Sequence, residues 1–123
     1  MLIPRGIVAA GLFAAHAATS HAAGDAAHGA QLYEQRCGAC HAVDANRVGP
    51  LHRDVFGRKA GAVPAYDYSP ALRDSKVRWD EATLNAWLAD PEKLIPGQRM
   101  GYAVNNAGDR VDLIAYLRSV SKP

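Results

Sequence analysis

Apolar residues recur at helical spacing in three segments of the chain, and these segments predict its main elements. Residues 25–36 start with an aspartate that can cap a helix, and residues 80–89 start with Asp-Glu and stop before Pro91. Residues 109–119 form a last helix with basic residues near its end. The apolar sides of these helices are formed by Ala26, Ala27, Ala30, Leu32 and Tyr33, by Leu84, Trp87 and Leu88, and by Leu113, Ile114, Tyr116 and Leu117. The pattern predicts an all-α protein.

The segments between these helices are rich in Gly and Pro, as loops are. Residues 42–69 predict an ordered loop, and a short helix follows over residues 69–75, where a serine cap precedes a proline. Residues 90–102, DPEKLIPGQRMGY, cannot form a continuous helix because Pro91 and Pro96 interrupt it. The sequence has no internal repeat, no second domain and no run of alternating polarity that predicts a strand. We therefore expect a single domain.

The N-terminus has the pattern of a secretory signal peptide. A short segment with one positive charge, Arg5, precedes an apolar, Ala-rich run over residues 6–18. A transmembrane anchor would need about 20 strongly apolar residues, so the anchor is the weaker interpretation. Small residues near Ala22 predict that residues 1–22 are removed, with cleavage one residue later as the alternative. The mature domain is then residues 23–123.

Charge excludes one class of partner. The chain has 14 Lys and Arg against 12 Asp and Glu, and removal of the signal peptide takes away Arg5. Such a balance lacks the excess of basic residues that nucleic-acid-binding proteins show. We expect no nucleic-acid partner.

Both cysteines of the chain lie in the segment RCGACH, at Cys37 and Cys40, with His41 directly after them. Three chemistries use this spacing: a redox dithiol, half of a zinc site, and covalent haem attachment. A zinc site usually has a second paired motif, whereas His28 and His52 have no paired spacing. A thioredoxin-like pair starts a helix after a strand, whereas this pair follows a helix. Haem accounts for all three residues, because two thioethers can hold the porphyrin while His41 faces the iron. We favour haem and keep the other two as alternatives.

Four stretches together, CGACH, VGPLHRDVFGRKAG, WDEATLNAWLADPEKLIPGQRM and DLIAYLRS, resemble a class I cytochrome c of the soluble mitochondrial or bacterial type. The resemblance spans residues 24–119. It implies the class I cytochrome c fold, a single domain of three to five short helices around one covalently bound haem c, with crossed N- and C-terminal helices. Gly29 and Tyr33 match one side of that crossing, and Leu113 and Tyr116 match the other.

The resemblance also implies the two iron ligands. The family takes its sixth ligand from a Pro-Gly-x-x-Met segment, which here ends at Met100, while His41 supplies the fifth ligand. Met100 is the only methionine left once residues 1–22 are removed, although a plain core methionine is the alternative. Pro50 matches the proline whose carbonyl accepts a hydrogen bond from the ligand histidine and orients it.

Further residues match positions around the haem. Arg58, Tyr68 and Trp79 match the groups that bind the propionates, and Trp87 replaces a tyrosine beside the methionine sulfur. Both tryptophans have an alternative interpretation as ordinary core aromatics. The chain departs from the family pattern at Gln98, where a hydroxyl residue is usual, and around His52, which we expect at the surface.

The resemblance implies a periplasmic one-electron carrier rather than an enzyme, because both axial positions of the iron are filled. We expect a soluble monomer without a membrane span. It would link a membrane quinol-oxidising complex or dehydrogenase to a terminal oxidase or reductase. The alternatives are a haem enzyme or gas sensor with a labile Met100, and a subunit docked permanently in one complex. Redox partners would meet a modestly basic face at the haem edge, thinned by Glu92 and formed by Arg36, Arg47, Lys93 and Arg99.

Overall fold

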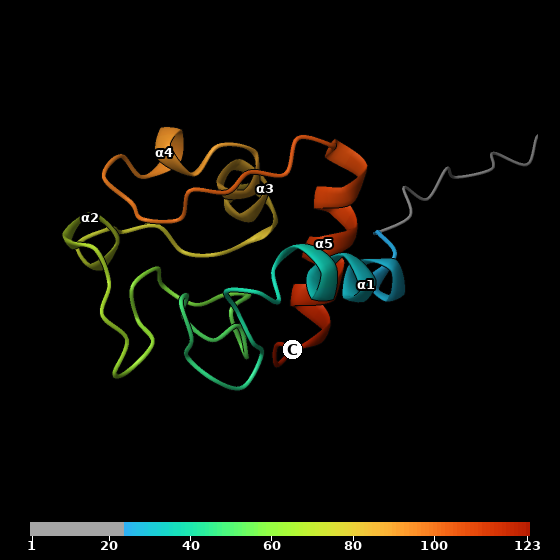
Figure 1. Ribbon diagram of the computed structural model, residues 1–123, viewed down its shortest axis with the longest axis horizontal. Coiled ribbons are helices and arrows are strands. Elements are labelled where there is room, and N and C mark those ends of the chain that lie inside the picture. Colours follow the sequence, from blue (N-terminus) through green and yellow to red (C-terminus); the bar gives the residue numbers. More distant parts are fainter. Residues whose placement is uncertain (1–23) are drawn as a thin grey trace, which may run out of the picture.

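Helices and long loops make up the computed structural model, which describes residues 24–123 (Figure 1). The helices of this range are α1 (Ala26–Arg36), α2 (Pro70–Arg73), α3 (Glu81–Ala89), α4 (Pro91–Leu94) and α5 (Ala107–Ser119). Among these residues the β pairing consists of one isolated bridge between Lys59 and Arg78. None of the helices within residues 24–123 has the length and apolar character needed to cross a membrane. The all-α prediction is confirmed, and the predicted signal peptide lies outside the described residues.

Side-chain caps explain why α1 and α3 begin where the sequence predicts. The carboxylate of Asp25 accepts hydrogen bonds from the backbone N–H groups of Ala27 and His28 at 2.9 and 3.1 Å. At α3, Asp80 accepts from the N–H of Thr83, and the Thr83 hydroxyl accepts from the N–H of Asp80, both at 2.8 Å. These bonds satisfy N–H groups that the first turn of a helix leaves without partners.

Three parts of the helix assignment differ from the sequence prediction. The short helix predicted over residues 69–75 ends earlier, because α2 stops at Arg73. The last helix starts at Ala107 rather than at residue 109, because Asn106 is its cap and accepts a hydrogen bond from the N–H of Asp109 at 2.9 Å. The segment after α3 contains one helical turn, α4, in which Pro91 occupies the first position and Asp90 is the cap. A proline is tolerated there because its missing N–H would have no helical partner.

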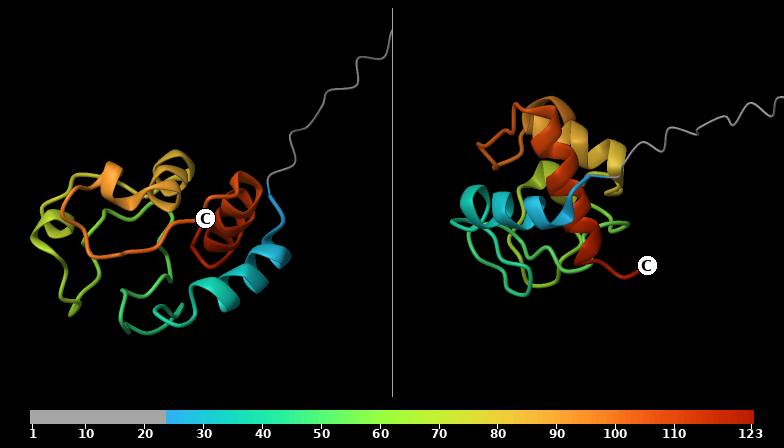
Figure 2. Two further views of the ribbon diagram at one scale, coloured as in Figure 1. Left: turned by 45° about the horizontal axis from the view of Figure 1, so that its top comes forward. Right: turned by 90° about the vertical axis from the view of Figure 1, so that its right-hand side faces the viewer.

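The first and last helices of the described chain, α1 and α5, pack against each other, and Figure 2 shows α1 lying across α5. The backbones approach so closely at Gly29 that a Cβ there would overlap with the carbonyl of Asp112. Beside this contact the rings of Tyr33 and Tyr116 lie 5.1 Å apart between centroids. Leu32, Leu113, Ile114 and Leu117 are buried around the crossing. The predicted crossing is confirmed.

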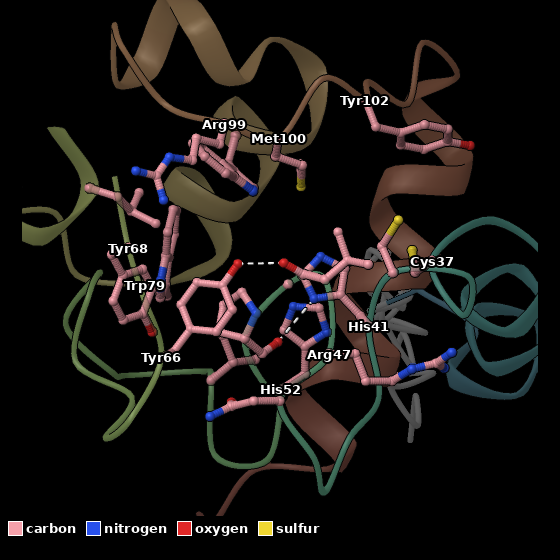
Figure 3. A pocket seen from close by; sticks show the side chains of 18 of the residues that line it. Cys37, His41, Arg47, His52, Tyr66, Tyr68, Trp79, Arg99, Met100 and Tyr102 are labelled. Carbon is pink, nitrogen blue, oxygen red and sulfur yellow. Dashed lines mark hydrogen bonds between the residues drawn. The ribbon is translucent and has the colours of Figure 1, made fainter. Parts of the chain in front are cut away.

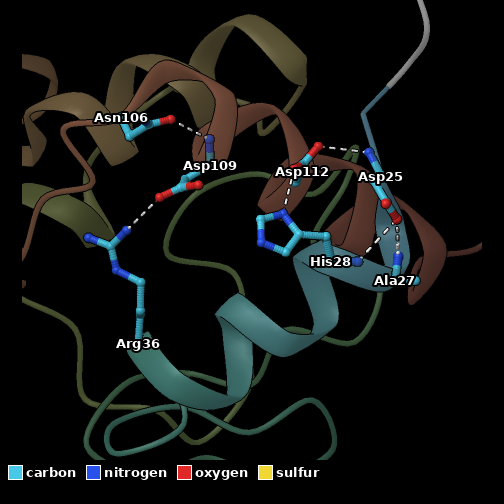
Figure 4. Close-up of polar contacts among 7 residues, drawn as sticks. All are labelled: Asp25, Ala27, His28, Arg36, Asn106, Asp109 and Asp112. Atoms are coloured by element: carbon cyan, nitrogen blue, oxygen red, sulfur yellow. Dashed lines mark hydrogen bonds and ion pairs between the residues drawn. The ribbon is translucent and has the colours of Figure 1, made fainter.

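Polar contacts secure both ends of this crossing (Figure 4). Asp112 on α5 accepts hydrogen bonds from His28 Nδ1 and from the N–H of Asp25, both at 2.7 Å. At the other end of α1, Arg36 donates to the carboxylate of Asp109 at 3.2 Å. The contact with Asp112 raises the pKa of His28, while the same contact lowers the pKa of Asp112. Two titratable groups, His28 and Asp112, therefore join the start of α1 to α5.

We predict that Gly29→Ala destabilises the protein by about 1–3 kcal/mol, because the added methyl group forces α1 and α5 apart. Denaturant unfolding of the haem-loaded protein measures the change. Gln31→Ala is the control, since Gln31 is an exposed residue of the same helix. Equal stability of the two variants would contradict the close helix contact.

The His28–Asp112 pair predicts a window of pH in which it stabilises the fold. Because the pKa of His28 is raised above 6.5, its contribution is complete below pH 6.5 and is lost as the pH rises through the folded value. Because the pKa of Asp112 is lowered below 3.8, its contribution is present above pH 3.8 and is lost on acidification.

Unfolding free energies of the parent and His28→Ala, measured across this range, should differ most between pH 3.8 and 6.5. Asp25 and Asp109 also face His28 and raise its pKa, so His28→Ala in an Asp112→Asn background is the control. A difference between parent and His28→Ala that does not vary with pH would refute the assignment to this pair.

Candidate functional site

A cavity of about 830 Å³ occupies the centre of the described chain. This volume lies within the range of sites that hold cofactors and small molecules, about 300–1,000 Å³. The loop after α1, the segment before α3, α3 itself and the loop between α4 and α5 all contribute to its walls (Figure 3). All nine residues that the sequence predicts for the site line this one cavity: Cys37, Cys40, His41, Pro50, Arg58, Tyr68, Trp79, Trp87 and Met100.

His41 is held in one orientation by the chain around it. The turn after α1 places it, since its N–H donates to the carbonyl of Cys37 at 2.8 Å. Its Nδ1 donates to the carbonyl of Pro50 at 2.9 Å, which leaves Nε2 without the proton in the neutral ring. Burial lowers the pKa of His41, so the neutral form is favoured. Gly49 lies against the ring so closely that a Cβ would overlap with it. The result is an imidazole prepared to donate an electron pair from Nε2.

The surroundings of Cys37 differ from those typical of a redox-active thiol. Cys37 is half-buried and Cys40 exposed at the cavity rim, and neither forms a disulfide. Burial raises the pKa of Cys37 to about 11, whereas redox-active cysteines have a lowered pKa. In residues 24–123 no three His, Cys, Asp or Glu side chains form a group that could hold a metal ion. Both cysteines thus lie at the cavity together with His41.

Met100 comes from the loop between α4 and α5, far along the chain from His41. Figure 3 shows its sulfur directed into the cavity, toward the side that holds His41. Trp79 and Trp87 lie on the same side of the site, with ring centroids 5.4 Å apart, and Trp79 is buried. The thioether sulfur of Met100 and the imidazole of His41 therefore face one largely apolar cavity from separate walls.

Arg58 and Tyr68 are two of the polar side chains that line the cavity. Arg58 donates to the carbonyls of Leu51 and Arg53, both at 3.0 Å, which uses part of its set of five donors. The Tyr68 hydroxyl accepts from the N–H of Val63 at 3.0 Å and keeps its own proton to donate. Both side chains retain donors for an acidic group, so their predicted role toward haem propionates is chemically consistent.

His52 is half-buried rather than fully exposed, so the sequence prediction of a surface residue is only partly right. Its ring stacks on that of His41, with centroids 4.2 Å apart and planes inclined by 23°. Its Nδ1 is hydrogen-bonded to the Tyr33 hydroxyl at 2.8 Å, and burial lowers its pKa well below the ordinary value. The surrounding loop has no periodic pattern, so no sequence signal could reveal this position. Through these two contacts His52 links Tyr33 on α1 to the ring of His41.

Gln98 does not reach the cavity. Its amide donates to the carboxylate of Glu92 at 3.0 Å, and Glu92 also accepts from the N–H of Gly97 at 2.9 Å. This pairing holds the turn that precedes Met100. It also gives Glu92, where the family often has a lysine, a structural partner.

The predicted basic face is largely engaged in contacts within the chain. Arg36 donates to Asp109 and to the Tyr102 hydroxyl, and Arg47 donates to the carbonyl of Gly38 at 2.8 Å. Arg99 lies near the carboxylate of Asp67 at 3.8 Å. These three arginines rim the cavity, while Lys93 is exposed on α4 and lies outside its lining. The carboxylates of Asp109 and Asp67 therefore offset part of the positive charge of Arg36 and Arg99.

Comparison with known proteins identifies relatives over nearly the whole described chain. A family model described as cytochrome c matches residues 26–121. Cytochrome c of Gibberella zeae is 40% identical over 105 residues, covering 82% of this chain and 99% of the relative. Cytochrome c2 of Rhodomicrobium vannielii is 41% identical over 104 residues, covering 81% of this chain and 82% of the relative. The solved structure of cytochrome cH from Methylobacterium extorquens matches with a TM-score of 0.74 and 42% identity, covering 78% of this chain and 99% of that one.

We predict that Tyr33→Phe destabilises the haem-loaded protein by about 1–3 kcal/mol, because it leaves the ring nitrogen of His52 without its partner. Thermal or denaturant unfolding measures the loss. Tyr116→Phe is the matched control, since Tyr116 packs against Tyr33 but its hydroxyl makes no hydrogen bond among the described residues. Adding His52→Leu to the Tyr33→Phe variant should restore stability, because no ring nitrogen is then left without a partner. A loss no larger than that of Tyr116→Phe would show that the hydrogen bond between Tyr33 and His52 does not stabilise the protein.

Proposed function

The chain belongs to the cytochrome c family, and we propose on this basis that it is a soluble, periplasmic one-electron carrier whose haem iron is bound by His41 and Met100. Its electrons would pass from a membrane quinol-oxidising complex or dehydrogenase to a terminal oxidase or reductase. Within this proposal the donor and acceptor are redox proteins that dock transiently at the rim of the cavity.

Family membership establishes the framework of the proposal. The chain has the all-α fold of class I cytochromes c and is an electron-transfer protein rather than an enzyme. It carries one haem c attached through its cysteine pair, Cys37 and Cys40. The haem-enzyme alternative does not fit this membership.

One observation carries the proposed ligation: His41 and Met100 reach the same cavity from separate loops, with the cysteine pair at its rim. When bound, haem supplies an iron that can gain and lose one electron, at a potential raised by a neutral thioether ligand. His41 presents Nε2 because the carbonyl of Pro50 holds the proton on Nδ1. With both His41 and Met100 bound, the iron would have no open site, which suits a carrier.

The remaining lining residues would hold the haem and keep water away. Trp79 and Trp87 form an apolar wall on the Met100 side, and buried Leu84 and Leu113 extend it. Arg58 and Tyr68 offer donors to the propionates, and without such partners a buried carboxylate is costly. Exclusion of water favours the uncharged sulfur as ligand over a solvent molecule.

The periplasmic assignment rests on the predicted signal peptide over residues 1–22, and the monomeric state on the resemblance. The partner surface would be the cavity rim, where Val48 and Tyr102 are exposed apolar side chains with 74% and 42% of their surface accessible. Since the rim arginines have partners within the chain, we expect docking to depend more on these apolar contacts than on long-range charge.

Optical spectroscopy of the haem-loaded protein tests the proposal. We expect the ferric form to show the near-infrared sulfur-to-iron band and the ferrous form to leave carbon monoxide unbound. Met100→Ala should abolish the band, bind carbon monoxide and lower the reduction potential, because the soft thioether is lost. Lys93→Ala, exposed on α4 and outside the cavity lining, is the control. A parent protein without the band, or one that binds carbon monoxide readily, would overturn the ligation and favour a gas-binding role.

A further inference from the structure

The segment that carries Met100 has little backbone support. In the described chain, residues 99–103 take no part in backbone-to-backbone hydrogen bonds. The nearest ones flank the segment, from Gln98 N–H to the Ile95 carbonyl at 3.2 Å and from Val104 N–H to the Leu88 carbonyl at 2.7 Å. The position of Met100 between these two anchors therefore depends on side-chain contacts.

Two arginine contacts tie this segment to the rest of the protein. Before Met100, Arg99 donates to the carbonyl of Asp67 at 3.2 Å, from a side chain that is 61% exposed. After Met100, the Tyr102 hydroxyl accepts from Arg36 Nε at 2.7 Å, and the Arg36 side chain is only 29% exposed. The second contact is shorter and better shielded from water, so it is the stronger tether.

Arg36 is well placed to hold Tyr102. Its Nη1 donates to Asp109 at 3.2 Å, which orients the guanidinium, and its charge lies 5.7 Å from the centroid of the Tyr102 ring. Arg36 directly precedes Cys37, while Tyr102 lies two residues after Met100. The bond therefore connects the segment that attaches the haem to the segment that supplies the sulfur.

We propose that the hydrogen bond between Arg36 and Tyr102 is a strap that keeps Met100 on the iron and sets how readily another ligand displaces it. The inference rests on the proposed ligation by His41 and Met100. It assigns Arg36 a positioning role, in place of the docking role expected from sequence. Gly101 makes the strap necessary, because the glycine between Met100 and Tyr102 gives the backbone freedom to swing away.

The strap is tested by the rate at which imidazole displaces Met100 in the ferric, haem-loaded protein. The imidazole nitrogen replaces the sulfur on the iron, no electron is transferred, and the loss of the sulfur-to-iron band follows the exchange. We expect Tyr102→Phe to accelerate the exchange by roughly three- to tenfold, the range for loss of one partly exposed, charge-assisted hydrogen bond.

The chain offers a matched control in Tyr66→Phe. Tyr66 also lies at the cavity, but its hydroxyl donates to the carbonyl of Val48 in the loop on the His41 side (Figure 3). Its removal should leave the exchange rate as in the parent. Arg36→Gln should accelerate exchange in the parent background and have a much smaller effect in the Tyr102→Phe background, because the bond is already absent there.

The outcomes separate this inference from the proposed function. A parent protein that shows the band and a Tyr102→Phe variant that exchanges at the parental rate would overturn the strap and leave the ligation intact. Additive effects of Arg36→Gln and Tyr102→Phe would also overturn it. Absence of the band from the parent would overturn both, since Met100 would then not bind iron.

Discussion

The close contact of α1 with α5 at Gly29 is the constraint on which the site depends. α1 leads directly into Cys37 and His41, and α5 starts shortly after the loop that carries Met100. When the two helices cross, the cysteine pair and the methionine are brought to one cavity although they lie far apart in the chain. A bulkier residue at the crossing would shift both walls, because interiors are close-packed and transmit strain.

A chain of contacts links this crossing to the imidazole of His41. Tyr33, packed against α5, is bonded to His52, and His52 stacks on His41. On the far side, Arg58 ties the neighbouring loop together through two carbonyls, which supports the position of Pro50. The ligand histidine is thus oriented by several segments rather than by its own turn alone. Because several segments hold the ring, little of this wall is free to rearrange.

The arginines around the cavity serve the interior as well as the surface. Arg36 and Arg99 hold either side of the Met100 segment, and Arg47 bonds the turn of the cysteine pair through the carbonyl of Gly38. Their charges are partly offset by Asp109 and Asp67. These rim cations therefore make contacts within the chain on both sides of the Met100 segment.

Local signals in the sequence determined the helices and the attachment motif, and they pointed to the two residues that we propose as iron ligands. Asp25 and Asp80 act as caps within a few residues of themselves, and the cysteine motif and Met100 are recognisable in short stretches, so no distant contact is needed to read them. Only the tertiary structure decided which side chains His52 and Arg36 contact. Their partners, Tyr33 and Tyr102, lie 19 and 66 residues away. Contacts over such separations arise only when α1 packs on α5 and the loops close around the cavity, and neither periodicity nor composition records that geometry.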